Sequence, residues 1–321
     1  MSGVLIAGGA GRLGRALARA LSSRGVVVLA LSREEADAAS VEALLAAGDR
    51  LPGGRPDAVV CAAAWTDVAG AERHRREARA GNVLAPRGAA RAAARWGAPI
   101  LHFSNDYVFS GGGRRGLSSS ERTLPQGAYG RTKLAGERAV RDAVRGTACG
   151  ALIVRAGWLF SETEPQGFPA RVLELALSGR LRSMRVNQYG RPTSYESLAA
   201  WCAEMIAGGG LRALEPGRTK TLHFAPEGPF VSRRALALHT LRRAASSPLM
   251  RDRPERARRV RAAGALAGVR AHVDSQPENC RLISEQQGFF WTKSDFFWPK
   301  SVDNSVDNFL RSRFAIGTTQ D

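Results

Sequence analysis

Short apolar runs alternate, along the first half of the chain, with segments in which apolar residues recur every three or four positions. The runs have lengths that suit buried strands, and they cover residues 4–7, 26–31, 57–62, 99–104 and 151–155. The periodic segments predict helices at residues 15–23, 41–47 and 85–96 and in the stretch that contains Tyr129. This alternation predicts an α/β fold: a Rossmann-like, doubly wound parallel sheet covered by helices on both faces.

The pattern becomes mixed after Gly167. Helices are expected at residues 170–177, 197–206 and 233–245, and a short strand at residues 221–224. Aromatic residues then concentrate in two clusters, at residues 288–291 and 296–299. An aromatic tail of this kind is expected either to pack onto the protein's own second domain or to contact a partner.

The composition is that of a globular protein. The chain has 321 residues, 44% of them hydrophobic, and no apolar run long enough to cross a membrane. The N-terminus lacks a secretory signal pattern. Neither the four scattered cysteines nor the five isolated histidines have metal-ligand spacing. We therefore expect a cytoplasmic protein with reduced thiols, no metal and no membrane partner.

The net charge of +18 suggests nucleic-acid binding at first sight. However, only four of the 47 basic residues are lysines, and the arginines are spread along the whole chain, as a GC-rich coding sequence would produce. The densest cluster, at residues 242–261, lacks the interleaved aromatic residues of a single-strand binder. We therefore expect no nucleic-acid partner.

Glycines follow the first expected strand at once. Gly8, Gly11 and Gly14 stand between that strand and the first expected helix, the context that a dinucleotide-binding loop requires. The first glycine permits a tight turn, the second lets a pyrophosphate approach, and the third allows close helix packing. Amides at the helix N-terminus, including those of Arg12 and Leu13, would hold the phosphates.

The end of the second expected strand bears on the choice of cofactor. It carries Ser32 and Arg33 and no acidic residue at its tip. An acid there would hold a ribose hydroxyl, whereas an arginine suits a 2′-phosphate. Arg33, with Ser32 and Arg12, therefore favours NADP(H) over NAD(H), although Arg33 can also be one more surface arginine.

Tyr129 and Lys133 stand four residues apart, on one face of an expected helix. An ammonium next to a phenol favours the phenolate and lowers the pKa of the tyrosine. A tyrosine tuned in this way exchanges protons near neutral pH. The spacing alone is also common on solvated helix faces.

The combination of these segments resembles the extended short-chain dehydrogenases/reductases and, more narrowly, the dTDP-4-dehydrorhamnose reductase family of sugar-nucleotide 4-ketoreductases. The resemblance spans roughly residues 3–285. Besides the glycine loop and the Tyr129 segment, it rests on residues 56–68, Glu72, Asn82 and residues 103–111, 155–160, 186–194 and 277–282.

The resemblance implies hydride transfer from NADPH to the C4 ketone of a nucleotide-linked, dTDP-type 6-deoxy sugar. Tyr129 would protonate the alkoxide, and Lys133 would tune Tyr129 and bind the nicotinamide ribose. Ala62, Ala63 and Ala64 would line the cofactor. The substrate would be contacted by Tyr107, Trp158, Gln188 and Arg191, although Trp158 can also be a core aromatic.

Three positions depart from the family pattern. Asn105 stands where the family has a threonine or serine whose hydroxyl assists the reaction, Asn187 replaces an aspartate, and Cys61 replaces an asparagine. The Asn105 amide can serve as an oxyanion donor. Three outcomes remain open: Asn105 replaces the hydroxyl, the reaction is slower or different, or the protein binds without turnover.

The resemblance also implies two domains with discontinuous boundaries. Residues 1–165, with a returning piece at about 186–225, would bind NADP(H). Residues 166–185 and 226–321 would form the substrate domain, including a divergent aromatic tail at 285–321. The cleft between domains is the expected ligand site, and a homodimer is a candidate assembly.

Two alternative functions stay open beside the sugar-nucleotide ketoreductase. One is a reductase of a non-sugar ketone or imine in secondary metabolism, which Asn105 would permit. The other is a non-catalytic NADP-binding regulatory subunit that uses the aromatic tail to hold a partner.

Overall fold

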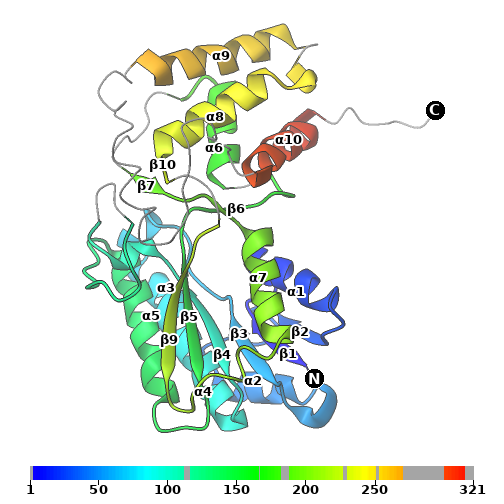
Figure 1. The fold of residues 1–321 in the computed structure, drawn as a ribbon, viewed down its shortest axis with the longest axis vertical. Coiled ribbons are helices and arrows are strands. Elements are labelled where there is room, and N and C mark those ends of the chain that lie inside the picture. Colours follow the sequence, from blue (N-terminus) through cyan, green and yellow to red (C-terminus); the bar gives the residue numbers. More distant parts are fainter. Residues whose placement is uncertain are drawn as a thin grey trace, which may run out of the picture. The chain divides into compact units, whose positions relative to one another are not determined.

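The computed structural model describes residues 3–111, 116–165, 167–181, 188–226, 230–250, 253–269 and 300–314. The chain divides into two compact units. Unit 1 comprises Met1–Gly111, Leu117–Ala156 and Tyr195–Phe224, and unit 2 comprises Gly112–Gly116, Gly157–Ser194 and Ala225–Asp321. Each unit contains its own helices and strands (Figure 1).

Unit 1 is built on a six-stranded sheet in the order β2-β1-β3-β4-β5-β9, and every neighbouring pair is parallel. The strands are β1 (Val4–Ala7), β2 (Val28–Leu31), β3 (Ala58–Cys61), β4 (Ile100–Ser104), β5 (Ala151–Ala156) and β9 (Thr219–Phe224). The chain moves outward from β1 to β2 and then returns to β3 on the other side of β1. In doubly wound sheets ligands bind at such a reversal, which here lies at the carboxyl ends of β1 and β3.

Helices of unit 1 pack as two layers. Its helices are α1 (Arg12–Ser22), α2 (Val41–Gly48), α3 (Arg75–Arg79), α4 (Ala85–Trp96), α5 (Ala128–Val144) and α7 (Tyr195–Ala207). Helix α1 packs against α7, whereas α4 packs against α2 and α5. Leu5 and Ala7 belong to the apolar cluster that joins the sheet to α2, α4 and α5. Short single turns complete the unit: η1 (Pro52–Gly54), η2 (Gly70–Glu72), η3 (Ala80–Leu84) and η4 (Asp106–Val108).

Unit 2 is mainly helical. It contains α6 (Phe168–Leu177), α8 (Arg233–Ala245), η5 (Pro248–Met250), α9 (Pro254–Val269) and α10 (Lys300–Phe314). Its apolar core includes Leu173, Leu241, Val260 and Leu310. Two strand pairs complete the unit, β6 (Leu159–Phe160) with β8 (Thr193–Ser194) and β7 (Tyr189–Gly190) with β10 (Val231–Ser232).

The predicted fold class is confirmed: the first half of the chain forms a doubly wound parallel sheet. The strand at residues 4–7 and the helices at residues 85–96 and 233–245 have the predicted bounds. Helix α1 begins earlier than expected, at Arg12, directly after the glycine loop.

Two stretches that the sequence placed in the first domain, residues 157–165 and 188–194, belong to unit 2. The reason is strand pairing within that unit, because Leu159 pairs with Thr193 and Gly190 pairs with Val231. The aromatic clusters at residues 288–299 and the segment at 277–282 lie outside the described residues. In the part of the chain that is described, no helix is long and apolar enough to span a bilayer.

Candidate active site

The glycine loop after β1 has a shape that side chains would block. Gly8 adopts a positive φ of 83°, and a Cβ there would lie 2.5 Å from the backbone nitrogen of Ala63. A Cβ on Gly14 would collide with the carbonyl oxygen of Gly8. A Cβ on Gly11 would meet only the Gly8 carbonyl, at 3.2 Å. The loop is therefore close to β3 on one side and open at Gly11, where a phosphate can approach.

The N-terminus of α1 has the features of an anion-binding site. Gly11 caps the helix without a side-chain hydrogen bond, and no acidic residue stands in its first turn. The first amides of a helix lack intrahelical acceptors, and the helix dipole favours negative charge there. The Leu13 side chain is buried, so this residue can contact a bound phosphate only through its backbone amide. The Arg12 side chain is exposed. This arrangement can hold the pyrophosphate of a dinucleotide.

Gly9 also shapes the loop, although the glycine spacing in the sequence did not indicate it. A Cβ there would lie 2.6 Å from the backbone carbon of Ala30 in β2. The amides of Gly8 and Gly9 both donate to the carbonyl oxygen of Leu31, at 3.1 and 2.7 Å. Two consecutive glycines directly after a strand were the available signal for this close approach to a second strand.

The end of β2 presents Ser32 and Arg33 beside this loop. The Ser32 amide donates to Glu35 Oε2 at 2.9 Å, and the Glu35 amide donates to Ser32 Oγ at 3.2 Å. This reciprocal pair fixes the turn. Arg33 is exposed.

Ala62 and Ala63 follow β3, and their amides donate to the carbonyl oxygen of Ala7 at 2.9 and 3.0 Å. The structure thus brings these predicted cofactor residues to one edge of the sheet, with Ala64 next in the chain.

Asn105 contacts Tyr129 directly. It follows β4, is buried, and donates from Nδ2 to Tyr129 Oη at 2.9 Å. Its Oδ1 accepts from the Tyr107 amide at 3.0 Å. Since a backbone amide only donates, this second bond fixes which end of the side chain faces Tyr129. The phenol oxygen therefore acts as an acceptor, which leaves its own proton for another group.

Lys133 lies one turn along α5 and is 4% exposed. Its Nζ donates to the carbonyl oxygen of Phe103 at 2.6 Å. Burial lowers the pKa of Lys133 to about 8, although Cys61 and Glu137 raise it. The charged ammonium thus sits in a largely apolar setting with one backbone acceptor from β4.

The predicted direction of the Tyr129 pKa shift is corrected by the structure. Burial raises the pKa of Tyr129 above the ordinary value for a tyrosine, and Asp106 and Tyr107 add to the rise. The hydrogen bond from Asn105 is the contact that lowers the pKa. The spacing of four residues was right for one helix face, but it carried no information on burial, which dominates here.

The first turn of α5 is fixed from outside the helix. Glu72 Oε1 accepts from the Ala128 amide at 2.6 Å and so caps a helix that has no side-chain cap of its own. Fully buried Asn82 accepts from the Trp65 amide at 3.1 Å and donates to Thr132 Oγ1 at 3.1 Å. Glu72 and Asn82 were part of the family resemblance, but these roles were not predicted.

A buried ion pair lies deeper along the same helix. Glu137 accepts two hydrogen bonds from Arg155 in β5, at 2.8 and 2.7 Å. Arg155 also donates to the Ser119 carbonyl at 3.2 Å, and its guanidinium lies 5.1 Å from the ring centroid of Phe109. The pair therefore holds the segment that follows η4. An arginine inside an apolar strand was the signal that a buried partner exists.

The predicted substrate residues fall into two groups. In unit 1, Tyr107 meets Tyr129 edge to face, with 5.5 Å between ring centroids. In unit 2, Trp158 has a positive φ of 54° and packs on Gly190. The carbonyl of Gln188 accepts from the Arg233 amide at 2.9 Å, and that of Arg191 accepts from Thr193 Oγ1 at 3.3 Å. Unit 2 therefore gathers Trp158, Gln188 and Arg191.

Arg233 is a residue of this second group that the sequence analysis did not single out. Its guanidinium lies 3.9 Å from the ring centroid of Trp158 and 4.7 Å from that of Phe168. Stacking on two rings fixes the Trp158 side chain. Trp158 was predicted either to contact substrate or to be a core aromatic, and it is partly exposed.

Side chains of the types that bind metal ions are dispersed in the described ranges. No group of three or more His, Cys, Asp or Glu side chains among them is arranged to hold an ion. The described cysteines, Cys61, Cys149 and Cys202, are buried free thiols. Asn187 and Cys280 lie outside the described residues.

Comparison with known proteins adds independent findings. A family model described as the RmlD substrate binding domain matches residues 1–282. The dTDP-4-dehydrorhamnose reductase of Streptomyces griseus is 37% identical over 231 residues, 70% of this chain and 74% of that protein. That of Mycobacterium tuberculosis is 35% identical over 232 residues, 70% of each. A solved dTDP-4-dehydrorhamnose reductase from Clostridium acetobutylicum matches with a TM-score of 0.63 and 28% identity, covering 75% of this chain and 79% of that one.

Proposed function

Since the chain belongs to the dTDP-4-dehydrorhamnose reductase family, we propose that it is an NADPH-dependent reductase of nucleotide-linked sugars. Its substrate carries a C4 ketone on a dTDP-linked 6-deoxy sugar, and Tyr129 is the proton donor. The observation that carries this proposal is the hydrogen bond from Asn105 Nδ2 to Tyr129 Oη.

The glycine loop and the end of β2 have the features that NADP(H) requires. The amides at the start of α1 bind the pyrophosphate, because they lack acceptors within the helix. Arg33 and Ser32, at the tip of β2, bind the 2′-phosphate together with Arg12, the first residue of α1. Ala62, Ala63 and Ala64 line the cofactor after β3. When bound, NADPH supplies the hydride, which adds to the ketone carbon.

Tyr129 then supplies the proton that completes the alcohol. Because its oxygen accepts from Asn105, its own O–H is directed to the substrate carbonyl oxygen. The raised pKa of Tyr129 keeps the phenol protonated until negative charge develops on that oxygen. The resulting phenolate is stabilised by the Asn105 N–H and by the ammonium of Lys133, which also binds the nicotinamide ribose. Tyr107, Trp158, Gln188 and Arg191 bind the sugar nucleotide.

A turnover assay tests the proposal. Purified protein mixed with NADPH and dTDP-4-dehydro-L-rhamnose should consume NADPH, and Tyr129→Phe should reduce kcat by about two or more orders of magnitude. Calorimetry of NADPH binding is the control, because the variant should bind the cofactor normally. Near-normal kcat in Tyr129→Phe would remove the proton-donor role.

Arg33→Ala tests the cofactor choice separately. Loss of a charge-assisted bond to the 2′-phosphate costs about 1.5–3 kcal/mol, or roughly 10- to 100-fold in kcat/KM for NADPH. The value for NADH should stay nearly constant. An equal loss with both cofactors would contradict a role in 2′-phosphate binding.

A second candidate, favoured by Asn105, is a reductase of a non-sugar ketone or imine. Asn105→Thr discriminates between the two. A rise in activity with 4-keto sugars would indicate that the native substrate lies elsewhere, whereas a collapse would show that Asn105 has its own role. Tight NADPH binding without turnover on any carbonyl substrate would instead favour the non-catalytic regulatory subunit.

A further inference from the structure

A row of buried polar side chains lies on the sheet under α5. Cys61 of β3 and His102 of β4 are register partners, so their side chains point to the same face of the sheet. Ser104, two residues after His102, shares that face. The charge of Lys133, from α5, acts on both Cys61 and His102. His102 is 1% exposed and Lys133 4% exposed, so the row is closed to bulk solvent.

Two members of this row, His102 and Ser104, have side-chain hydrogen-bonding atoms that are unused in the described structure. Both ring nitrogens of His102 are buried without a hydrogen-bond partner in the described structure, and so is Ser104 Oγ. The backbone of Cys61 lies near the imidazole and favours its protonated form, but neither nitrogen reaches hydrogen-bond geometry. Buried polar groups in folded proteins are nearly always paired, directly or through water. The imidazole therefore offers a hydrogen-bond donor and an acceptor that the described structure leaves unused.

The imidazole is neutral in this environment. Burial holds the pKa of His102 well below its usual range, and the charge of Lys133 lowers it further. A neutral imidazole has one N–H and one lone pair. The Cys61 thiol is also neutral, because burial raises its pKa to about 12. Glu137 is the acid that acts on Lys133, and it is bound to Arg155.

Lys133 is the group in this row that needs an acceptor. An ammonium has three donors, and the hydrogen bond to the Phe103 carbonyl uses one of them. A lone pair on the imidazole lowers the cost of keeping this buried group charged through one bridging water, because no direct hydrogen bond joins the two side chains in the described structure.

We propose that His102 is a positioning residue that acts through Lys133: its unprotonated ring nitrogen accepts a hydrogen bond from a bridging water that is held by the buried ammonium, and it thereby keeps the ammonium charged one helical turn from Tyr129. The proposal rests on the proposed function, because that function gives Lys133 its role in the reaction. His102 itself does not touch the reacting atoms.

Nuclear magnetic resonance of Lys133 tests the proposal without any turnover. The full chain has only four lysines, so ¹⁵N-lysine labelling gives few side-chain signals, and Lys133→Arg identifies the relevant one. His102→Phe should lower the pKa of Lys133 by about one unit, a tenfold change in its deprotonation equilibrium. His102→Gln retains an acceptor and should shift the pKa much less. An unchanged pKa in His102→Phe, or equal shifts in the two variants, would overturn the proposal.

A measurement on the unmodified protein covers the case in which a His102 variant fails to fold. With ¹⁵N-histidine labelling, the unprotonated nitrogen of His102 should change its chemical shift as Lys133 titrates near pH 8. The loss of the donated hydrogen bond is the cause of that change. A His102 signal that stays constant across this titration would show that the two side chains are not coupled.

The pH dependence of kcat gives a third test, and the direction of the expected change follows from the charge of Lys133. Lys133 is charged below its pKa, so its contribution to turnover is lost as the pH rises through that value. His102→Phe should therefore move the alkaline limb of the kcat profile to lower pH, with a larger loss at pH 8 than at pH 6. A purely structural role would reduce kcat equally at all pH values. If no sugar substrate is reduced, the proposed function fails, while the resonance tests of His102 still give their answer.

Discussion

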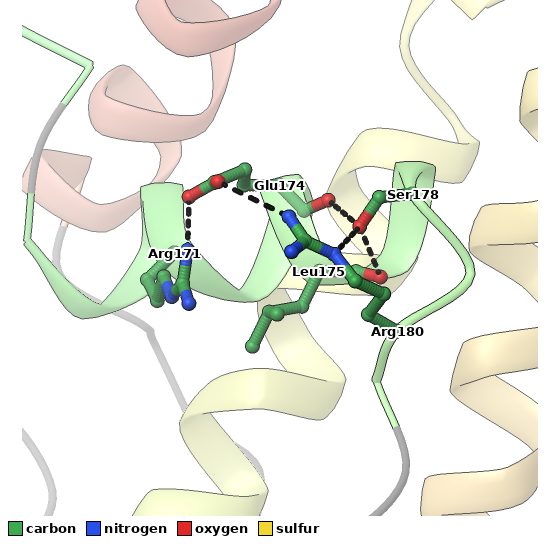
Figure 2. A network of polar contacts seen from close by, with 5 residues as sticks. All are labelled: Arg171, Glu174, Leu175, Ser178 and Arg180. Carbon is green, nitrogen blue, oxygen red and sulfur yellow. Dashed lines mark hydrogen bonds and ion pairs between the residues drawn. The ribbon is translucent and has the colours of Figure 1, made fainter.

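Two clusters of glutamate and arginine differ mainly in their exposure to water. In unit 1, Glu137 and Arg155 form two parallel hydrogen bonds, and their side chains are 0% and 6% exposed. In unit 2, Glu174 of α6 contacts Arg171 at 2.6 Å and Arg180 at 3.7 Å, and these side chains are 46%, 57% and 63% exposed (Figure 2). The chemical groups are the same, and some distances are equally short.

Distance alone therefore does not measure what an ion pair contributes. Water screens the Glu174 cluster and solvates its members when they separate, so an exposed pair contributes about 0–1 kcal/mol. The Glu137–Arg155 pair has no such alternative, because either charge alone would be stranded in an apolar interior. The buried pair thus acts as a strict constraint on the segment around Phe109, whereas the exposed cluster mainly keeps the α6 surface hydrated.

The largest effect is expected from Glu137→Gln. This change keeps the size of the side chain but leaves Arg155 charged and buried, and it should reduce the free energy of unfolding by about 3–5 kcal/mol. Urea denaturation measures the loss. The double variant Glu137→Leu/Arg155→Met is the control, and it should recover much of the stability because no unpaired charge remains. A loss below about 1 kcal/mol in Glu137→Gln would show that the buried pair contributes no more to stability than the exposed cluster.

Lys133→Met should change the free energy of unfolding by an intermediate amount and in the opposite direction, because this change should stabilise the protein. Burial depresses the pKa of Lys133 from 10.5 to about 8. The unfolded chain therefore binds this proton more tightly, and stability is lost as the pH falls from about 10.5 to 8. Removal of the charge should raise the free energy of unfolding at pH 7 by about 1–3 kcal/mol while turnover is lost.

Urea denaturation of Lys133→Met and of the unmodified protein at pH 7 and pH 10 checks both the size and the sign. The stabilising effect of the variant should shrink at the higher pH. A variant that is destabilised at pH 7 would show that the Phe103 carbonyl and the neighbouring groups already compensate for the buried charge.

The smallest effect is expected from Glu174→Gln. It removes both ion pairs of the exposed cluster, but the hydrogen bonds of Ser178 to the carbonyls of Glu174 and Leu175 persist (Figure 2). The free energy of unfolding should change by less than about 0.5 kcal/mol, and less still at high salt. Thermal denaturation at two salt concentrations measures this change. A loss comparable to that of Glu137→Gln would break the comparison.

The sequence predicted those features whose causes lie within a few residues. Gly8, Gly11 and Gly14 stand between a strand and a helix, and their local geometry follows from that order. Tyr129 and Lys133 share a helix face because their spacing dictates it. The doubly wound parallel sheet followed from the alternation of strands and helices, whereas the order of its strands came from the structure.

Features that depend on distant partners were not predictable in the same way. The cap that Glu72 provides for α5 joins residues 56 positions apart, and Asn82 reaches Thr132 across 50 positions. The sign of the Tyr129 pKa shift was predicted wrongly, because burial arises only when the sheet and helices pack together. Residues 188–194 were expected in the first domain, but they pair with strands of unit 2, one earlier in the chain at Leu159–Phe160 and one later at Val231–Ser232.

The two hydrogen bonds of Asn105 have a consequence for the direction of proton movement. A hydroxyl at this position could rotate and exchange its donor and acceptor, whereas the amide is fixed at one end by the Tyr107 N–H. Its nitrogen therefore always faces the phenol. An aspartate of the same shape would present an oxygen instead and would draw the phenolic proton toward the protein. The phenol donates its proton toward the substrate side, and not toward the protein, because the side-chain atom that faces it is a nitrogen and not an oxygen.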